Sequence, residues 1–178
     1  MNRFVVFLRG ININGKNKIL MSDLKNELFQ LGFCEVTSYL NSGNVSFSCN
    51  IQSADEVKKT VNKMITDKFG LSVPVYVTTK NKLNEILKNA PCWWGTDNKD
   101  TYDNLIFILS DDTPADICNL IGKPSLNLEK IEIFENTVFW SFDRKNYRKC
   151  NWWKKTAMNG IAEKLTVRTV GTIRKICN

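Results

Sequence analysis

The amino-acid sequence predicts an α+β fold in which the order β-α-β-β-α-β occurs twice. Short apolar runs that are typical of strands alternate with longer segments in which apolar residues recur at helical spacing. Clusters of glycine, asparagine and proline separate these segments, as expected for turns. The pattern of the first half recurs in the second half of the 178 residues, which indicates a duplication.

The first half contains one full copy of the pattern. In its first helix Leu24, Leu28 and Leu31 share one face, and Gly32 follows as a C-terminal signal. A hairpin-type turn at 41–44 joins the second strand to the third. We expect strands at 4–9, 36–40, 45–49 and 73–78, and helices at 22–31 and 54–69.

The second half repeats the pattern after a connecting helix at 81–89, which Pro91 ends. Thr113, Pro114 and Asp116 form a strong helix start, because they supply a cap, a proline at the first position and a carboxylate near the helix dipole. We expect strands at 105–109, 131–134 and 138–142, a helix over about 151–164, and a short strand or turn before a helical tail. The prediction is two ferredoxin-like subdomains, 1–79 and 80–178.

The segment 9–18 lies between the first strand and the first helix. It holds two glycines, three asparagines and three cationic side chains, so backbone N–H groups and cations can converge there on an anion. In a split β-α-β unit the first two strands are parallel, with the third antiparallel between them. The segment 9–18 and the turn 41–44 should therefore be neighbours and form one composite polar site.

Each residue type has an expected role at this composite site. Cationic side chains would supply charge, glycines would allow close backbone approach, and the asparagines and serine would orient the ligand. The expected ligand-binding residues are Arg9, Gly10, Asn12, Gly15, Lys16, Asn17, Lys18, Asn41, Ser42, Gly43 and Asn44.

The sequence partly resembles two nucleotide-binding motifs, the P-loop and the RNA-recognition module, but matches neither in full. Gly10, Gly15 and Lys16 have the spacing of a P-loop, but Asn17 replaces the magnesium-binding hydroxyl, and the helix begins about five residues too late. An RNA-recognition module shares the predicted topology, yet the strand 45–49 lacks the aromatic and glycine pattern of that module.

Two tryptophan pairs allow two interpretations each. The segment 144–155 is basic and contains Trp152 and Trp153, so it has the composition of a base-stacking surface for single strands. Trp153 also lies at helical spacing with Ala157 and Ile161, which favours a core position for one tryptophan. The same two alternatives apply to the pair at 93–94.

Composition limits the remaining classes of function. A net charge of +7 favours polyanionic partners. Six cysteines without C-x-x-C spacing and the absence of histidine argue against a metal site and against a Ser or Cys triad, and no cofactor is expected. Apolar runs reach only about five or six residues, which predicts a cytoplasmic protein without a membrane span or signal peptide, and leaves the oligomeric state open.

Four short motifs carry a resemblance to a known family. At Leu8–Asn12, Gly15–Lys18, Leu31–Phe33 and Tyr39–Val45 the chain resembles the bacterial family called domain of unknown function 1697. The resemblance implies two ferredoxin-like subdomains and supplies no reaction.

The resemblance is looser toward the C-terminus. Trp153-Lys154 stands at the position of the family's Ser-Lys helix start. In the family's Thr-x-Arg-Asn-x-x-Thr-x-x-Lys-Leu signature Thr172 and Lys175 fit, but the Thr-Arg-Asn step is shortened at 167–169. Asn14 also replaces a usual glycine, and Leu20 a usual proline. The resemblance implies four secondary site candidates, Lys154, Arg168, Thr172 and Lys175.

Three hypotheses of function follow. The first is a binding or regulatory protein for a phosphate-bearing or other anionic ligand, nucleic acid included. The second is an enzyme of phosphoryl or nucleotide processing. In the third, the asparagines and glycines only cap strands and helices, and the chain is a structural or interaction protein.

Overall fold

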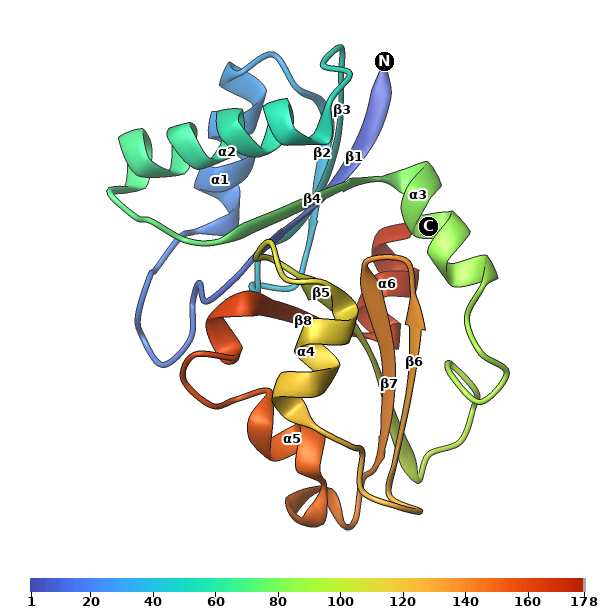
Figure 1. The fold of residues 1–178 in the computed structure, drawn as a ribbon. Coiled ribbons are helices and arrows are strands. Elements are labelled where there is room, and N and C mark those ends of the chain that lie inside the picture. Colours follow the sequence, from blue (N-terminus) through green and yellow to red (C-terminus); the bar gives the residue numbers. More distant parts are fainter. Residues whose placement is uncertain (178) are drawn as a thin grey trace. The chain divides into compact units, whose positions relative to one another are not determined.

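In a computed structural model the chain forms two compact units, each built on a four-stranded antiparallel sheet (Figure 1). Unit 1 holds Met1–Glu85 together with the end of the chain from Arg174, and unit 2 holds Ile86–Ile173. The structure describes residues 1–177. The predicted α+β fold with two similar β-α-β-β-α-β halves is confirmed.

Unit 1 has the strand order β2-β3-β1-β4. Because β3 pairs antiparallel with both β1 and β2, the strands β1 and β2 run parallel to each other, as the split unit requires. The elements are β1 (Asn2–Leu8), α1 (Met21–Gln30), β2 (Cys34–Tyr39), β3 (Asn44–Cys49), α2 (Ala54–Phe69), β4 (Val75–Thr79) and α3 (Lys80–Lys88), of which α3 extends past Glu85 into unit 2.

The core of unit 1 lies between the sheet and the helices α1 and α2 (Figure 1). Alternate residues of β1, Phe4, Val6 and Leu8, point into it, because successive side chains of a strand face opposite sides. Gly70 ends α2 in the left-handed conformation, which explains why the predicted end of this helix agrees with the observed one.

Unit 2 repeats this plan with the strand order β6-β7-β5-β8. Thr113 accepts a hydrogen bond from the Asp116 N–H, and the Asp116 carboxylate accepts one from the Thr113 N–H, so the predicted helix start is a complete capping box. The elements are β5 (Thr101–Ile108), α4 (Pro114–Ile121), β6 (Glu129–Phe134), β7 (Thr137–Asp143), α5 (Asn151–Lys155), β8 (Leu165–Thr169) and α6 (Val170–Cys177), with 3-10 turns at Tyr147–Lys149 and Ala162–Lys164. The helix α6 extends past Ile173 into unit 1.

The helix predicted over 151–164 is much shorter, since α5 ends at Lys155. Trp152, not Trp153, enters the core: Trp152 is fully buried and Trp153 is 40% exposed. The buried Glu129 carboxylate accepts the backbone N–H groups of both tryptophans at the start of α5. The Trp152 indole N–H also donates to the Gly122 carbonyl at 2.9 Å, so tertiary hydrogen bonds orient this helix.

Gly43 lies against the end of β1. Its φ is +76°, and a Cβ there would lie 2.6 Å from the Leu8 Cβ. Gly43→Ala should lower the free energy of unfolding by about 2 kcal/mol or more, because left-handed strain and a steric overlap add. Gly15→Ala is the matched control, since Gly15 has φ +75° and open space around it. Urea denaturation of both variants checks the difference, and equal losses would contradict it.

Candidate functional site

The loop 9–18 and the turn 41–43 lie side by side in unit 1. The Asn12 Nδ2 donates to the Asn41 carbonyl at 2.8 Å, and the Leu8 N–H donates to the Gly43 carbonyl at 2.8 Å. Both contacts follow from the strand order, because the end of β1 and the start of β3 share one edge of the sheet. The residues of the expected composite site are thus close in space.

The asparagine side chains of this region are largely used to hold the backbone. Asn12 also donates from Nδ2 to the Ile19 carbonyl and accepts the Ile19 N–H at Oδ1, both at 2.9 Å. Asn17 donates to the Gly10 carbonyl, and the buried Asn44 donates to the Tyr39 carbonyl and the Ser42 hydroxyl. These amides give the loop and the turn their shape, a role that the third hypothesis assigned to them.

Left-handed backbone conformations explain the loop's composition. Gly10, Asn12, Asn14, Gly15 and Asn17 all have φ between 48° and 75°. Glycine and asparagine are the residues that adopt this conformation most readily. The backbone conformation of the loop therefore explains why it is rich in glycine and asparagine.

The cationic side chains of the loop differ in exposure. Lys16 and Lys18 are exposed and form no ion pair within residues 1–177. Arg9 is half-buried, and its backbone N–H donates to the Pro74 carbonyl at 2.9 Å. In the turn, Asn41 and Ser42 are exposed and Gly43 is buried. The loop thus presents two ammonium groups to solvent.

A second cationic feature of unit 1 was missed by the sequence reasoning, except for Lys175. It is a hollow of about 290 Å³, which we call the basic hollow. Arg3 comes from β1, Lys80 begins α3 and Lys175 lies in the last turn of α6. Residues 37–39 of the edge strand β2 also line it, and Ile176 completes the lining. No local motif joins these residues, because four separate elements contribute them.

Charge in the basic hollow is partly balanced by Glu35. Its carboxylate accepts from the Ser48 hydroxyl at 2.7 Å and from Arg3 Nη1 at 2.8 Å, and these contacts, the Ser48 hydrogen bond foremost, hold the pKa of Glu35 below its usual value. A bulge in β2, with Glu35 at φ 52°, accompanies this placement. Lys80 and Lys175 have no acidic partner in the described part of the chain.

The cysteine beside this hollow is a poor nucleophile. Burial raises the pKa of the Cys177 thiol to about 11, and the Lys80 ammonium offsets only part of this effect. Because the thiolate is the reactive form, Cys177 stays unreactive near neutral pH. Burial likewise raises the pKa of the thiols of Cys49, Cys118 and Cys150.

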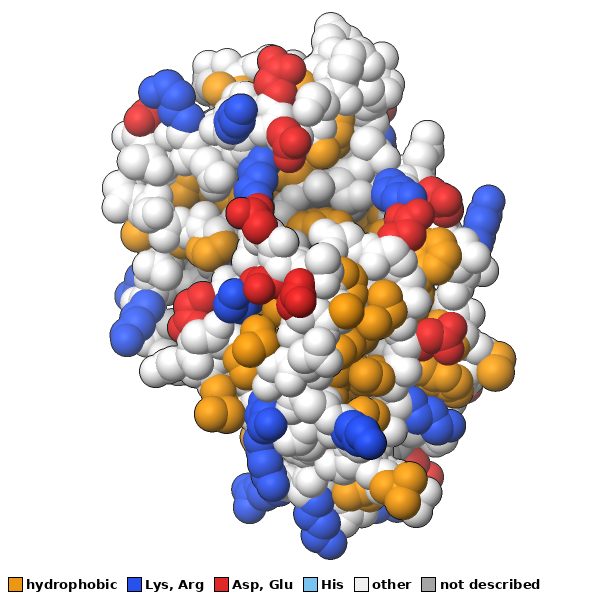
Figure 2. All heavy atoms as spheres, viewed as in Figure 1, with side chains coloured by type: hydrophobic (Ala, Val, Ile, Leu, Met, Phe, Trp, Pro, Cys, Tyr) orange, Lys and Arg blue, Asp and Glu red, His pale blue; other side chains and the backbone are white. Residues whose placement is uncertain are grey.

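The other secondary candidates belong to unit 2. Lys154 is exposed on α5, where Figure 2 shows several Lys and Arg side chains. Arg168 Nη1 donates to the Thr166 hydroxyl at 3.0 Å and to the Val167 carbonyl. The buried Thr172 lies 3.1 Å from the Thr169 hydroxyl, which also caps the start of α6. Arg168 and Thr172 therefore have local structural contacts.

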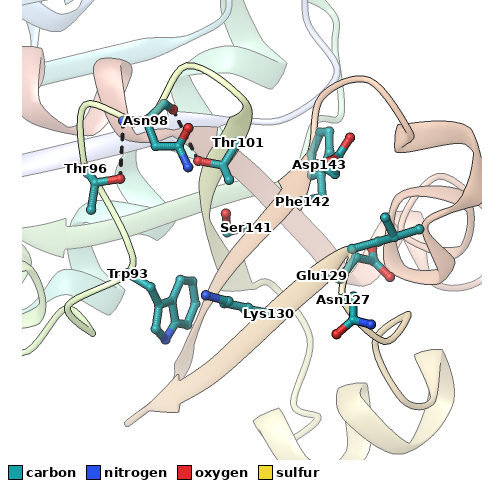
Figure 3. Close-up of a pocket in the computed structure, with 11 residues that line it drawn as sticks. Trp93, Thr96, Asn98, Thr101, Asn127, Glu129, Lys130, Ser141, Phe142 and Asp143 are labelled. Atoms are coloured by element: carbon teal, nitrogen blue, oxygen red, sulfur yellow. Dashed lines mark hydrogen bonds between the residues drawn. The ribbon is translucent and has the colours of Figure 1, made fainter.

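Unit 2 contains a larger hollow of about 580 Å³, which we call the unit 2 hollow (Figure 3). Trp93, Thr96, Asn98 and Thr101 line it from the segment before and at the start of β5. Lys130 and Ser141 line it from β6 and β7. At this volume the hollow is in the range of small-molecule sites.

Within 1–177 no three Cys, Asp or Glu side chains gather so as to hold a metal ion. No helix in this range is both long enough and apolar enough to cross a membrane.

The fold defines the chain as an α+β protein of two ferredoxin-like units. Residues 1–139 match the model of the family described as protein of unknown function (DUF1697), and the chain belongs to this family. A comparison with curated proteins gave no match.

Among solved structures, the chain is similar to the conserved bacterial protein SP0830 from Streptococcus pneumoniae. The TM-score is 0.86 at 25% identity, over 99% of this chain and 97% of the other. An unknown protein from Galdieria sulphuraria also matches, over 95% of this chain and 98% of the other, but with 11% identity and a TM-score of 0.27.

Asn12 and Asn14 test whether the loop depends on its amide contacts. Asn12→Gly should lower the free energy of unfolding by about 2 kcal/mol, because three hydrogen bonds are lost while glycine accepts the left-handed backbone. Asn14→Gly should change it by less than about 0.5 kcal/mol, since Asn14 is exposed and has a similar φ of 49°. Chemical denaturation measures both, and equal effects would show that the Asn12 contacts add nothing.

Proposed function

We propose that the chain binds a phosphate-bearing anionic ligand in unit 1, with the basic hollow as the primary site. One observation carries this proposal: Arg3, Lys80 and Lys175 converge on one hollow from three separate elements. Gathering like charges is unfavourable unless a counter-charge is present. Glu35 pairs with Arg3 and so balances only one of the three cationic side chains. A bound anion would reduce the repulsion among all three.

The other lining groups suit the same ligand. The Tyr39 hydroxyl can donate a hydrogen bond to a phosphate oxygen, because Tyr39 lies on the same face of the sheet as Arg3, and the two lysines act as point charges. A volume near 290 Å³ is at the small end of ligand sites, which fits a phosphate group with a compact substituent. Cys177 stays protonated, so these groups favour binding over covalent chemistry.

The loop 9–18 and the turn 41–44 are proposed as a further contact for a longer polyanion such as nucleic acid. β2 connects the two regions, since Tyr39 lines the basic hollow and the turn follows directly. Lys16 and Lys18 would meet additional phosphates, and the net charge of +7 favours such partners. All six cysteines are free, which supports the further proposal that the protein is cytoplasmic.

Two matched double variants test the primary site. Lys80→Ala with Lys175→Ala should weaken the binding of pyrophosphate by about tenfold or more, because two charge-assisted contacts are removed. Lys16→Ala with Lys18→Ala removes the same charge from the loop and should change pyrophosphate binding less than about threefold. Isothermal titration calorimetry at fixed ionic strength measures both, and thermal melts verify folding.

A labelled single-stranded RNA tests the extended contact. Both double variants should weaken RNA binding measured by fluorescence anisotropy, and each should lower the magnitude of the slope of log affinity against log salt concentration by about 1.4, because each removes two phosphate contacts. If both variants weaken pyrophosphate binding equally, the hollow is not a specific site. If the native chain binds neither probe at low salt, the proposed function is wrong.

A further inference from the structure

The unit 2 hollow combines an aromatic wall with polar groups that the fold leaves unused. In Figure 3 Trp93 lies on one side, Thr96, Asn98 and Thr101 lie on another, and Ser141 lies between them. This site is independent of the basic hollow, because all of its residues belong to unit 2.

Trp93 is held at the wall by its neighbours. Trp94 is buried, donates its indole N–H to the Asn104 carbonyl at 2.7 Å, and contacts Phe139 edge-on. The Gly95 N–H donates to the Asp103 carboxylate at 2.8 Å. The chain is therefore anchored directly after Trp93. The Trp93 indole itself has no hydrogen-bond partner among the described residues, and its ring lines the hollow.

The segment 96–101 forms a preorganised polar wall. The Thr101 hydroxyl donates to the Asn98 carbonyl at 3.3 Å, and Asn98 Oδ1 accepts the Asp100 N–H at 2.9 Å. The Thr96 hydroxyl accepts the Asn98 N–H at 3.4 Å (Figure 3). Asn98 Nδ2 and the Ser141 hydroxyl find no partner in residues 1–177, so they remain available to a ligand.

The charges around the hollow favour a neutral ligand. The residues that line the hollow include one cationic side chain, Lys130, and two carboxylates, Glu129 and Asp143. These carboxylates are already used: Glu129 caps α5, and Asp143 accepts the N–H groups of Lys145 and Asn146, which lowers its pKa. A ligand phosphate would therefore meet more negative than positive charge.

A buried acceptor without a donor lies beside the same wall. Asp103 is directly opposite Ser141 in the β5–β7 ladder and is 6% exposed. Its Oδ2 accepts from Gly95, but Oδ1 has no partner among the described groups. Asp103 lines an adjoining hollow of about 250 Å³ that shares Thr96, Asn98 and Thr101 with the first. A ligand hydroxyl that reached Oδ1 would remove the cost of this unpaired acceptor.

We propose that the unit 2 hollow binds a neutral nucleoside. The base stacks on Trp93, and the ribose hydroxyls exchange hydrogen bonds with Asn98, Ser141 and the shared wall. Each part follows from the lining: an indole face offers stacking, hydroxyl and amide groups match a vicinal diol, and the carboxylates disfavour a phosphate. A volume near 580 Å³ accommodates a ligand of this size.

Calorimetric titration of the full chain with adenosine and with uridine tests the proposal. Trp93→Ala should weaken binding by about tenfold or more, because a base stack is lost, whereas Trp93→Phe should keep most of the affinity. Trp153→Ala is the matched control: it removes a tryptophan that is 40% exposed elsewhere in unit 2 and should leave binding unchanged. Circular dichroism melts verify that each variant is folded.

Further ligands distinguish nucleoside binding in the unit 2 hollow from binding in the basic hollow and from binding of a saccharide. In the Lys80→Ala, Lys175→Ala background, AMP should bind more weakly than adenosine, because its phosphate meets the carboxylates of the unit 2 hollow. Equal effects of Trp93→Ala and Trp153→Ala would overturn the proposal. So would free ribose or glucose binding as tightly as adenosine, or no binding of either nucleoside to the native chain at about 10 mM. Loss of pyrophosphate binding alone would count only against the basic hollow.

Discussion

Each unit depends on its central strands, β1 and β3 in unit 1 and β5 and β7 in unit 2, which are hydrogen-bonded on both sides. β1 pairs with β3 and β4, and β5 pairs with β7 and β8, so the backbone polar groups of these strands are satisfied while their side chains are buried. Phe4–Leu8 are all buried, as are Asp103–Ile108. The remaining elements are arranged around these strands, because a strand buried on both faces must be covered on both.

The central strands also determine where ligands can bind. Side chains that alternate with the helix-facing core residues project from the other face of each sheet, and both hollows use such residues. Arg3, next to the core residue Phe4, lines the basic hollow, and Thr101 at the start of β5 lines the unit 2 hollow. The loop 9–18 follows the opposite end of β1, where asparagines shape the backbone and two lysines remain exposed.

The sequence predicted helix boundaries well where the residues that set them are neighbours in the chain. The helix start at Thr113 and the end of the helix 54–69 were placed correctly, because caps depend on residues within one turn of the helix. The pairs Trp93–Trp94 and Trp152–Trp153 were not resolved. In each pair one indole is buried and donates its N–H to a distant carbonyl, Asn104 for Trp94 and Gly122 for Trp152, and no periodicity within the segment shows which one does so.

The sequence by itself determined the α+β class, the repeated element order and the proximity of the loop 9–18 to the turn 41–44, because apolar period, turn chemistry and strand order are sufficient for these. Only the tertiary structure decided which polar side chains are used internally and which line a hollow. Asn12 and Asn44 serve the backbone, whereas Arg3, Lys80 and Lys175 meet from distant segments. Such encounters depend on packing between elements far apart in the chain, and composition alone carries no information about them.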